Sequence, residues 1–233
     1  MVYADIQSGK FIKRINRFLA WVEIENQVVE VHVKNTGRCK EILQEGVTVF
    51  LEPSKNLNRK TRYSLVSAFK GKLLINIDSQ IPNHVIYEGI NQKKMEDFQD
   101  IAVLKKEKTY GQSRFDLYFE RENGQKGFVE IKGVTLENDG IAMFPDAPTL
   151  RGTKHLNEMI AAIQEGYEGY VIFLIQIDKI NRFQPNDLMD PLFGETLRKA
   201  IDAGVNVMVY NSYVTEKGIT LANRGTVEII SKS

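Results

Sequence analysis

Two short runs, RFDLYF at residues 114–119 and GFVEIKG at residues 127–133, decide how the second half of this chain is interpreted. Both runs alternate apolar and polar side chains with the period of two that is typical of β-strands. The alternation predicts that Asp116 lies on one face of the first strand and that Glu130 and Lys132 share one face of the second. The first run then directs its large apolar side chains to the opposite face: Phe115, Leu117 and Phe119.

If the two strands pair in register, these two carboxylates and the lysine meet. Carboxylates held close together repel each other unless a divalent cation lies between them. Mg²⁺ is usually held by one or two carboxylates together with water and substrate phosphate oxygens, and Mn²⁺ has similar preferences. A neighbouring lysine orients the attacking water and stabilises charge on a phosphoryl group. The pattern predicts a metal-dependent site for phosphodiester hydrolysis, with Asp116 and Glu130 as metal ligands and Lys132 as a catalytic partner. The acid-x-Lys spacing alone is weak evidence, because surface ion pairs give the same pattern.

The composition is that of an ordinary globular protein, with 233 residues, 42% hydrophobic and 26% charged residues and a net charge of +1. The longest apolar stretches are too short to span a bilayer, and no signal segment is evident, so we expect a cytoplasmic protein without a membrane partner. Cys39 has no second cysteine to pair with. His32, His84 and His155 are scattered along the chain, and we therefore expect no structural zinc.

The charge is distributed unevenly. Residues 1–82 hold 13 Lys and Arg against 8 Asp and Glu, whereas residues 83–233 hold 18 against 22. This asymmetry predicts two domains with that boundary. A basic first domain is able to follow a phosphate backbone, although a solvated surface is the plainer interpretation. The residues expected to contact DNA in the first domain are Lys10, Lys13, Arg14, Arg17, Arg38, Arg59 and Lys60.

The first 80 residues consist almost entirely of short strands separated by turn signals, with one helical turn expected near residues 38–43. This density of strands favours a small closed barrel such as an OB-fold, a fold that often presents a nucleic-acid surface but also serves other purposes. The expected strands span residues 11–16, 19–24, 28–33, 47–52, 63–69 and 73–77.

After Pro82 helices alternate with strands, and the order predicts an α/β sandwich whose central sheet is covered on both faces. Asn83 caps the first predicted helix, and the last one begins at Asn186 or Asp187. The helices are expected at about residues 83–90, 152–165 and 186–203, and further strands at 101–107, 170–175 and 205–210.

Several longer blocks are more specific. They are VKNTGR at 33–38, EKTYGQSRFD at 107–116, EIKGVTL at 130–136, FPDAPT at 144–149 and RGTKHL at 151–156. With these blocks the chain resembles, over nearly its whole length, the bacterial and archaeal sugar fermentation stimulation protein A family. The resemblance implies an N-terminal OB-like domain, a C-terminal domain of the PD-(D/E)XK nuclease type, and DNA binding with a regulatory role in sugar use.

The resemblance places the family's strand aspartate at Asp116 and its acid-x-Lys triplet at Glu130 and Lys132. Phe115 stands where the superfamily motif has proline, which carries no chemistry. Pro145 and Asp146 spell the same dipeptide, but they follow the triplet in the chain. We therefore interpret Asp146 as a loop residue near the site rather than the first metal ligand.

Five further residues are candidates beside this core. Glu88, on the first helix of the second domain, either reaches the metal through water or is a surface carboxylate. Glu107, at the end of the preceding strand, is an alternative ligand. Arg151 and Lys154 lie near a helix N-terminus, where backbone N–H groups favour phosphate, and both are expected to contact DNA. His155 is either catalytic or a hydrogen-bonded structural residue.

Two functions remain open. The leading hypothesis is a DNA-binding protein with a Mg²⁺- or Mn²⁺-dependent nuclease core. The alternative is a non-catalytic DNA-binding regulator of sugar (maltose) metabolism genes. No helix-turn-helix pattern is evident, so readout of bases by a recognition helix is not expected. The sequence leaves the oligomeric state open, and a homo-oligomer is compatible with it.

Overall fold

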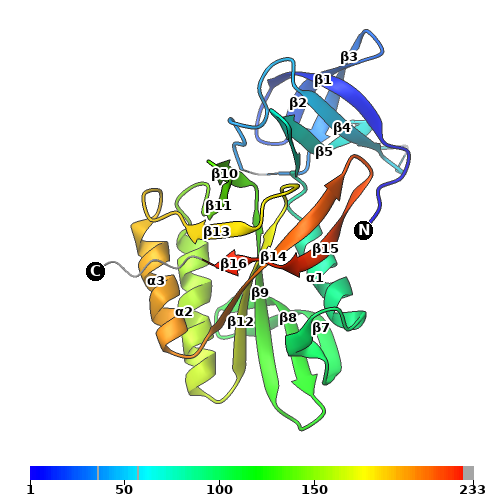
Figure 1. Cartoon of the computed structure of the whole chain (residues 1–233). Coiled ribbons are helices and arrows are strands. Elements are labelled where there is room, and N and C mark those ends of the chain that lie inside the picture. Colours follow the sequence, from blue (N-terminus) through cyan, green and yellow to red (C-terminus); the bar gives the residue numbers. More distant parts are fainter. Residues whose placement is uncertain (36, 57, 228–233) are drawn as a thin grey trace.

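The computed structural model describes residues 1–35, 37–56 and 58–227. It consists of a small β-barrel followed by an α/β domain (Figure 1). Thr36, within one of the motif blocks, and residues 228–233 of the expected second domain lie outside the described residues. No helix in the described part of the chain has the length and apolar character needed to cross a membrane.

The barrel forms because its strands bury every second side chain. Strand β2, for example, buries Ala20, Val22 and Ile24 and exposes or half-exposes the residues between them. The sheet has the order β3-β2-β1-β4-β5-β6, and a further parallel pairing of β3 with β5 closes five strands into a barrel. The N-terminal domain is therefore the closed OB barrel that the strand pattern predicted. Its strands are β1 (Gln7–Arg14), β2 (Leu19–Ile24), β3 (Gln27–Val33), β4 (Thr48–Pro53), β5 (Tyr63–Lys70) and β6 (Leu73–Asn76).

The second domain is built on a six-stranded sheet of order β15-β14-β12-β9-β8-β7, in which β9, β12 and β14 run parallel. Helix α1 packs on one face, and α2 and α3 pack on the other (Figure 1). This is the expected sandwich. The strands are β7 (Ile101–Tyr110), β8 (Ser113–Arg121), β9 (Lys126–Val134), β12 (Glu168–Ile175), β14 (Asn206–Thr215) and β15 (Gly218–Arg224), and the helices are α1 (Ile81–Asn91), α2 (Leu150–Gln164) and α3 (Pro191–Asp202).

A second, smaller sheet was not predicted. It has the order β10-β11-β13-β16, and its strands are only two to four residues long, too short for alternation to be recognised. A short 3₁₀ turn, Glu96–Phe98, also escaped prediction. The four strands are β10 (Leu136–Asn138), β11 (Ile141–Phe144), β13 (Arg182–Pro185) and β16 (Thr226–Val227).

The predicted helix starts need correction. Helix α1 begins at Ile81 instead of Asn83, because Pro82 fits the first helical turn, where its missing N–H costs no hydrogen bond. Helix α3 begins at Pro191 after Asp190, whose carboxylate accepts from the N–H of Phe193 at 3.0 Å. The predicted start of α3, several residues earlier, was therefore wrong.

Two further local predictions concern the start of α2 and a turn in the barrel. Helix α2 begins two residues before the predicted start, because the hydroxyl of Thr149 accepts from the N–H of Gly152. The helical turn expected near residues 38–43 is present as a single turn, in which the carbonyl of Cys39 accepts from the N–H groups of Ile42 at 3.1 Å and Leu43 at 2.8 Å. A side-chain cap such as that of Thr149 is local, and it overrides the hydrophobic period that guided the prediction of the helix start.

The two domains are joined by a buried polar network. Asn76, Asp78 and Gln176 are all at most 1% exposed. The side-chain amide of Gln176 donates to the backbone carbonyls of Asn76 at 3.0 Å and Asp78 at 3.1 Å. Beside it, Ile75 of the barrel forms an isolated bridge with Ile177 of the second domain. Because every buried polar group here has a partner, the network fixes one domain against the other.

The first residues of the chain lie against the second domain. Val2 forms a bridge with Gly218, at the start of β15, and the hydroxyl of Tyr3 accepts from the side-chain amide of Asn76 at 2.9 Å. The start of the chain therefore belongs, by its contacts, to the joint between the domains.

Candidate active site

Asp116 lies where strands β8 and β9 separate. The two strands pair as far as Leu117 opposite Val129. Beyond that pair, the carboxylate of Asp116 accepts a backbone hydrogen bond from β9 in place of a backbone carbonyl of β8. Its Oδ2 accepts from the backbone N–H of Ile131 at 2.8 Å, and its Oδ1 accepts from the side-chain amide of Asn83 on α1 at 2.8 Å. The carboxylate is thus held between the central strand and the first helix.

The predicted alternation fails at this point. Phe115 packs with Phe128 in the core beneath α2 and α3, with ring centroids 5.1 Å apart, whereas Leu117 and Phe119 belong to the core beneath α1. The prediction that the three share one face was wrong. Across from this point, on β7, Glu107 has φ +55°, a left-handed conformation that does not continue a regular strand. The distorted strand pair and the end of the β8–β9 ladder accompany the change of face.

Glu130 is the buried centre of the site. Its side chain is 5% exposed, and its Oε1 accepts from Nζ of Lys132 at 2.6 Å and lies 2.5 Å from Nδ1 of His155. Although burial alone would raise its pKa, Lys132 and His155 hold the pKa of Glu130 below its usual range. Within the described part of the chain, its Oε2 is buried without a hydrogen-bond partner.

The carboxylates of Asp116 and Glu130 interact electrostatically. Burial, and then the negative charge of Glu130, raise the pKa of Asp116 to about 6, and the bonds from Ile131 and Asn83 only partly offset this. A divalent cation would relieve both the repulsion and the unpartnered oxygen, so oxygen ligands of this kind fit Mg²⁺ or Mn²⁺. The described residues hold no group of three or more His, Cys, Asp or Glu side chains placed for a metal. The remaining ligands would have to be backbone oxygens, water or substrate.

Asp116 borders a cavity of about 450 Å³ between α1 and strands β7 and β8. The same cavity is lined by Asn83, Lys106 and Glu107. Glu107 itself is 63% exposed and forms an ion pair with Arg114 at 3.4 Å. Glu107 therefore lies beside the site, and its carboxylate is paired with the guanidinium of Arg114.

Glu88 faces elsewhere. Its carboxylate is 51% exposed, forms an ion pair with the N-terminal amine of Met1 at 3.5 Å and lines a different hollow. A residue five positions beyond Asn83 lies about 140° further round an α-helix, which turns Glu88 away from Asp116. The interpretation of Glu88 as a surface carboxylate is the one that the structure supports.

The residues after β11 line a groove of about 470 Å³ between the domains. Asp146 lies in a loop of this groove, and Arg17 from the barrel and Arg151 from α2 line it as well. The side chain of Arg151 lies 3.5 Å from Nε2 of His155, which links the groove to the buried pair of His155 and Glu130. His155 is therefore a hydrogen-bonded partner of the site carboxylate.

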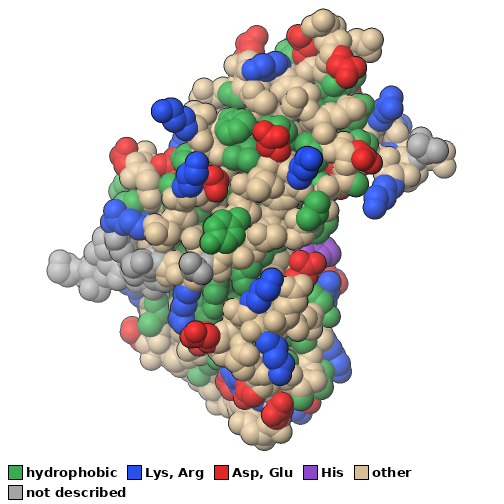
Figure 2. Space-filling model, turned by 45° about the vertical axis from the view of Figure 1, so that its right-hand side comes forward, with side chains coloured by type: hydrophobic (Ala, Val, Ile, Leu, Met, Phe, Trp, Pro, Cys, Tyr) green, Lys and Arg blue, Asp and Glu red, His purple; other side chains and the backbone are tan. Residues whose placement is uncertain are grey.

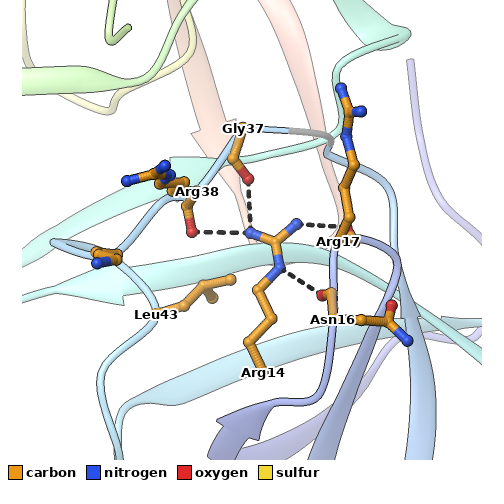
Figure 3. Close-up of a pocket in the computed structure, with 7 residues that line it drawn as sticks. Arg14, Asn16, Arg17, Gly37, Arg38 and Leu43 are labelled. Carbon is orange, nitrogen blue, oxygen red and sulfur yellow. Dashed lines mark hydrogen bonds between the residues drawn. The ribbon is translucent and has the colours of Figure 1, made fainter.

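Two predicted DNA contacts are engaged inside the protein. The guanidinium of Arg14 donates to the backbone carbonyls of its own turn and of the facing loop (Figure 3). That of Arg59 donates to Thr61, Ser64 and the carbonyl of Tyr63. Their role as phosphate contacts stays a prediction, but Arg14 makes five internal hydrogen bonds and Arg59 three, so Arg14 in particular has few donors left for phosphate.

The other basic candidates remain at the surface. Lys13 lies over the ring of Trp21 at 4.7 Å, Lys10 donates to the hydroxyl of Thr48 at 3.0 Å, and Lys154 donates to the carbonyl of Gln112 at 3.2 Å. Arg17, Arg38 and Lys60 are exposed, and no described carboxylate pairs with them. On the face shown in Figure 2, basic and acidic side chains are interspersed, so no continuous basic surface covers it.

Sequence reasoning missed Asn83 and Lys106 as neighbours of Asp116. Asn83 was interpreted as a helix cap, because asparagine next to proline is a strong local signal. Lys106 precedes Glu107 in the predicted strand, and only the pairing of β7 with β8 brings it to the cavity. No local pattern marks either residue.

Known proteins similar to this chain share both domains. Residues 12–77 match the family model described as SfsA N-terminal OB domain, and residues 80–218 match Sugar fermentation stimulation protein RE domain. A sugar fermentation stimulation protein homolog of Clostridium botulinum (strain Loch Maree / Type A3) is 52% identical over 97% of this chain and 98% of its own length. A homolog of Clostridium acetobutylicum is 53% identical over 91% of this chain and 93% of its own length.

One solved structure has the same fold throughout. It is described as Pyrococcus furiosus SfsA in complex with Ca²⁺, and it is 27% identical to this chain. The superposition gives a TM-score of 0.90 and covers 98% of both chains.

Proposed function

The chain belongs to the sugar fermentation stimulation protein family, and from this premise we propose that it binds DNA and hydrolyses phosphodiester bonds with a divalent metal ion. The observation that carries the proposal is the electrostatic interaction of Asp116 with Glu130 and Lys132, beside the point where β8 and β9 separate. There a buried carboxylate oxygen has no partner among the described residues, and a second carboxylate has a raised pKa. Such paired perturbations are typical of catalytic sites.

Asp116 and Glu130 would hold the metal ion, Mg²⁺ or Mn²⁺. When bound, the ion supplies Lewis-acid polarisation of the phosphoryl group. The solved relative described as a complex with Ca²⁺ supports a site for divalent cations in this fold. Ca²⁺ and Mg²⁺ both prefer oxygen ligands, so the same two carboxylates suit either ion.

The surrounding residues position the two carboxylates. Asn83 and the backbone N–H of Ile131 hold Asp116, and His155 holds one oxygen of Glu130. The side chain of Lys132 is 14% exposed, and its ammonium group has three donors, of which Glu130 uses one; the others would donate to the attacking water or to a phosphoryl oxygen. Such a group, fixed in a water-poor site, stabilises charge that develops in the transition state.

The test compares Lys132→Ala with Lys126→Ala, a change of an exposed lysine on the same strand. Plasmid and oligonucleotide substrates are incubated with Mg²⁺, Mn²⁺ or EDTA. We expect metal-dependent cleavage by the wild type and by Lys126→Ala, and a loss of about 10²-fold or more in rate for Lys132→Ala, because one charge-stabilising group is removed. DNA binding should be retained by all three.

The alternative function, a DNA-binding regulator without catalysis, makes the opposite prediction for the same experiment. Rigorously purified wild type would then shift DNA in a gel and leave every substrate uncut with either metal. That result would refute the hydrolase.

A further inference from the structure

A pocket of about 580 Å³ opens in the barrel between the turn that joins β1 to β2 and the loop of residues 37–43 (Figure 3). Its volume suits a ligand the size of a nucleotide or a small cofactor. The pocket does not include any of the residues assigned to the hydrolytic site.

Arg14 fixes the two walls of this pocket relative to each other. Its guanidinium donates to the carbonyls of Asn16 and Arg17 on one wall and to those of Asn35, Gly37 and Arg38 on the other. The bonds are 2.6 to 3.2 Å long. Because the walls are tied by backbone acceptors, the pocket is a preformed feature of the barrel.

The free cations of the pocket are Arg17, Arg38 and Lys40. All three are exposed, and no described carboxylate lies within ion-pair distance of them or lines the pocket. Leu43, only 8% exposed, supplies an apolar surface beside them. Three positive charges that form no ion pair with a described carboxylate, next to an apolar surface, favour a ligand that carries phosphate on a less polar body.

The pocket shares lining residues with the hollows that lead to Asp116. Arg17 and Gly37 line both this pocket and the groove between the domains. Ser79 lines both that groove and the cavity at Asp116. Three neighbouring hollows therefore lie in succession from the basic pocket, past the joint between the domains, to the candidate site.

We propose that this pocket receives the phosphate-bearing end of a nucleic-acid strand whose adjoining nucleotides lie in the groove between the domains. An internal phosphodiester carries one negative charge, whereas a terminal phosphate carries close to two at pH 7. The three free cations match the terminal group better. The inference rests on the proposed function for the nature of the ligand, but it does not require that the protein cuts the strand.

The test measures binding in EDTA by fluorescence anisotropy with the full chain, so that cleavage does not interfere. The probes are internally labelled single strands of about 12 nucleotides, within the range that OB-folds cover. They carry a 5′-phosphate, a 3′-phosphate or hydroxyls at both ends. We expect one phosphorylated end to bind about tenfold more tightly than the hydroxyl probe, the gain typical of a charge-assisted hydrogen bond.

The variants Arg38→Gln and Lys40→Gln should abolish this preference, while Lys72→Gln, a change of an exposed lysine elsewhere on the barrel, should retain it. Replacing Arg38 leaves the backbone carbonyl that Arg14 uses in place, and thermal unfolding checks that each variant folds. A preference that persists in both pocket variants would place the strand end elsewhere and overturn the proposal.

Further outcomes of the experiment distinguish this proposal from the proposed function. Equal affinity for all probes overturns the pocket, and so does displacement by deoxyadenosine monophosphate at the affinity of the oligonucleotide, because the ligand would then be a free nucleotide. Absence of any binding overturns the pocket and the DNA-binding part of the proposed function together. A preference for a phosphorylated strand end without cleavage supports the pocket and refutes only the proposed hydrolysis. Cleavage without such a preference supports the hydrolysis and refutes only the pocket.

Discussion

Asp116→Asn should make the protein more stable at neutral pH while removing its metal-dependent function. Burial and Glu130 raise the pKa of Asp116 from 3.8 to about 6. Each pKa unit corresponds to about 1.4 kcal/mol, so the buried charge costs about 3 kcal/mol of unfolding free energy above pH 7. An asparagine carries no charge and is able to keep both neighbours, since it accepts from the N–H of Ile131 and donates to a reoriented Asn83.

The sign of the pH dependence follows from the same shift. Because the folded carboxyl binds its proton more tightly than the unfolded one, this group's contribution to stability falls as the pH rises from about 4 to about 6. The advantage of Asp116→Asn should therefore be largest above pH 7 and shrink toward pH 4. Saturating Mg²⁺ should stabilise the wild type and stabilise the variant less, because a ligand that binds only the folded state adds to its stability.

The assay is urea unfolding followed by far-UV circular dichroism at pH 4, 5.5 and 7.5, with Glu45→Gln as a control. Glu45 is an exposed carboxylate that forms no ion pair with a described residue. Equal stability of Asp116→Asn and the wild type at pH 7.5, or an advantage that grows toward pH 4, would refute the reasoning.

Three further outcomes are expected. Replacing His155 by alanine should raise the pKa of Glu130 and weaken Mn²⁺ binding, because one of its two charge partners is lost; unchanged Mn²⁺ affinity by titration calorimetry would contradict this. Arg14→Lys should cost about 2–3 kcal/mol in urea unfolding, since an ammonium cannot reach carbonyls on both walls, whereas a loss below experimental error would show that the walls hold without it. DNA affinity should fall steeply with salt, and replacing Arg17 and Lys60 together by alanine should reduce the slope of log affinity against log salt by up to about two; an unchanged slope would place the DNA elsewhere.

Much of the architecture was predictable because it depends on local periodicity. Alternation along β2 and β12 and the apolar stripes of the helices are written into neighbouring residues, so the barrel and the sandwich follow from them. The small sheet was not predictable, because strands of two to four residues contain no period. The helix starts failed for a different reason, since single capping contacts such as that of Asp190 decide them.

The candidate residues of the site could be named from the sequence, but their geometry could not. The acid-x-Lys triplet and the preceding aspartate stand in the sequence. The insertion of Asp116 between two separating strands depends instead on Asn83, which is 33 positions away. The use of Arg14 as an internal tie was equally hidden, because its acceptors are backbone carbonyls, and every sequence has those. Contacts of this kind are set by the tertiary fold.

The buried network at Asn76, Asp78 and Gln176 also limits how such a protein can change in evolution. The OB and RE family models meet between residues 77 and 80, which invites the view that the parts are interchangeable modules. The partners of the Gln176 amide, however, lie outside the second model: Asn76 belongs to the barrel model and Asp78 lies between the two. A barrel transplanted from a distant relative would leave this buried amide unsatisfied unless it placed the two backbone carbonyls, and a side-chain oxygen like that of Asn76 at 3.2 Å, in the same positions. The geometry of the two parts at the joint therefore has to match.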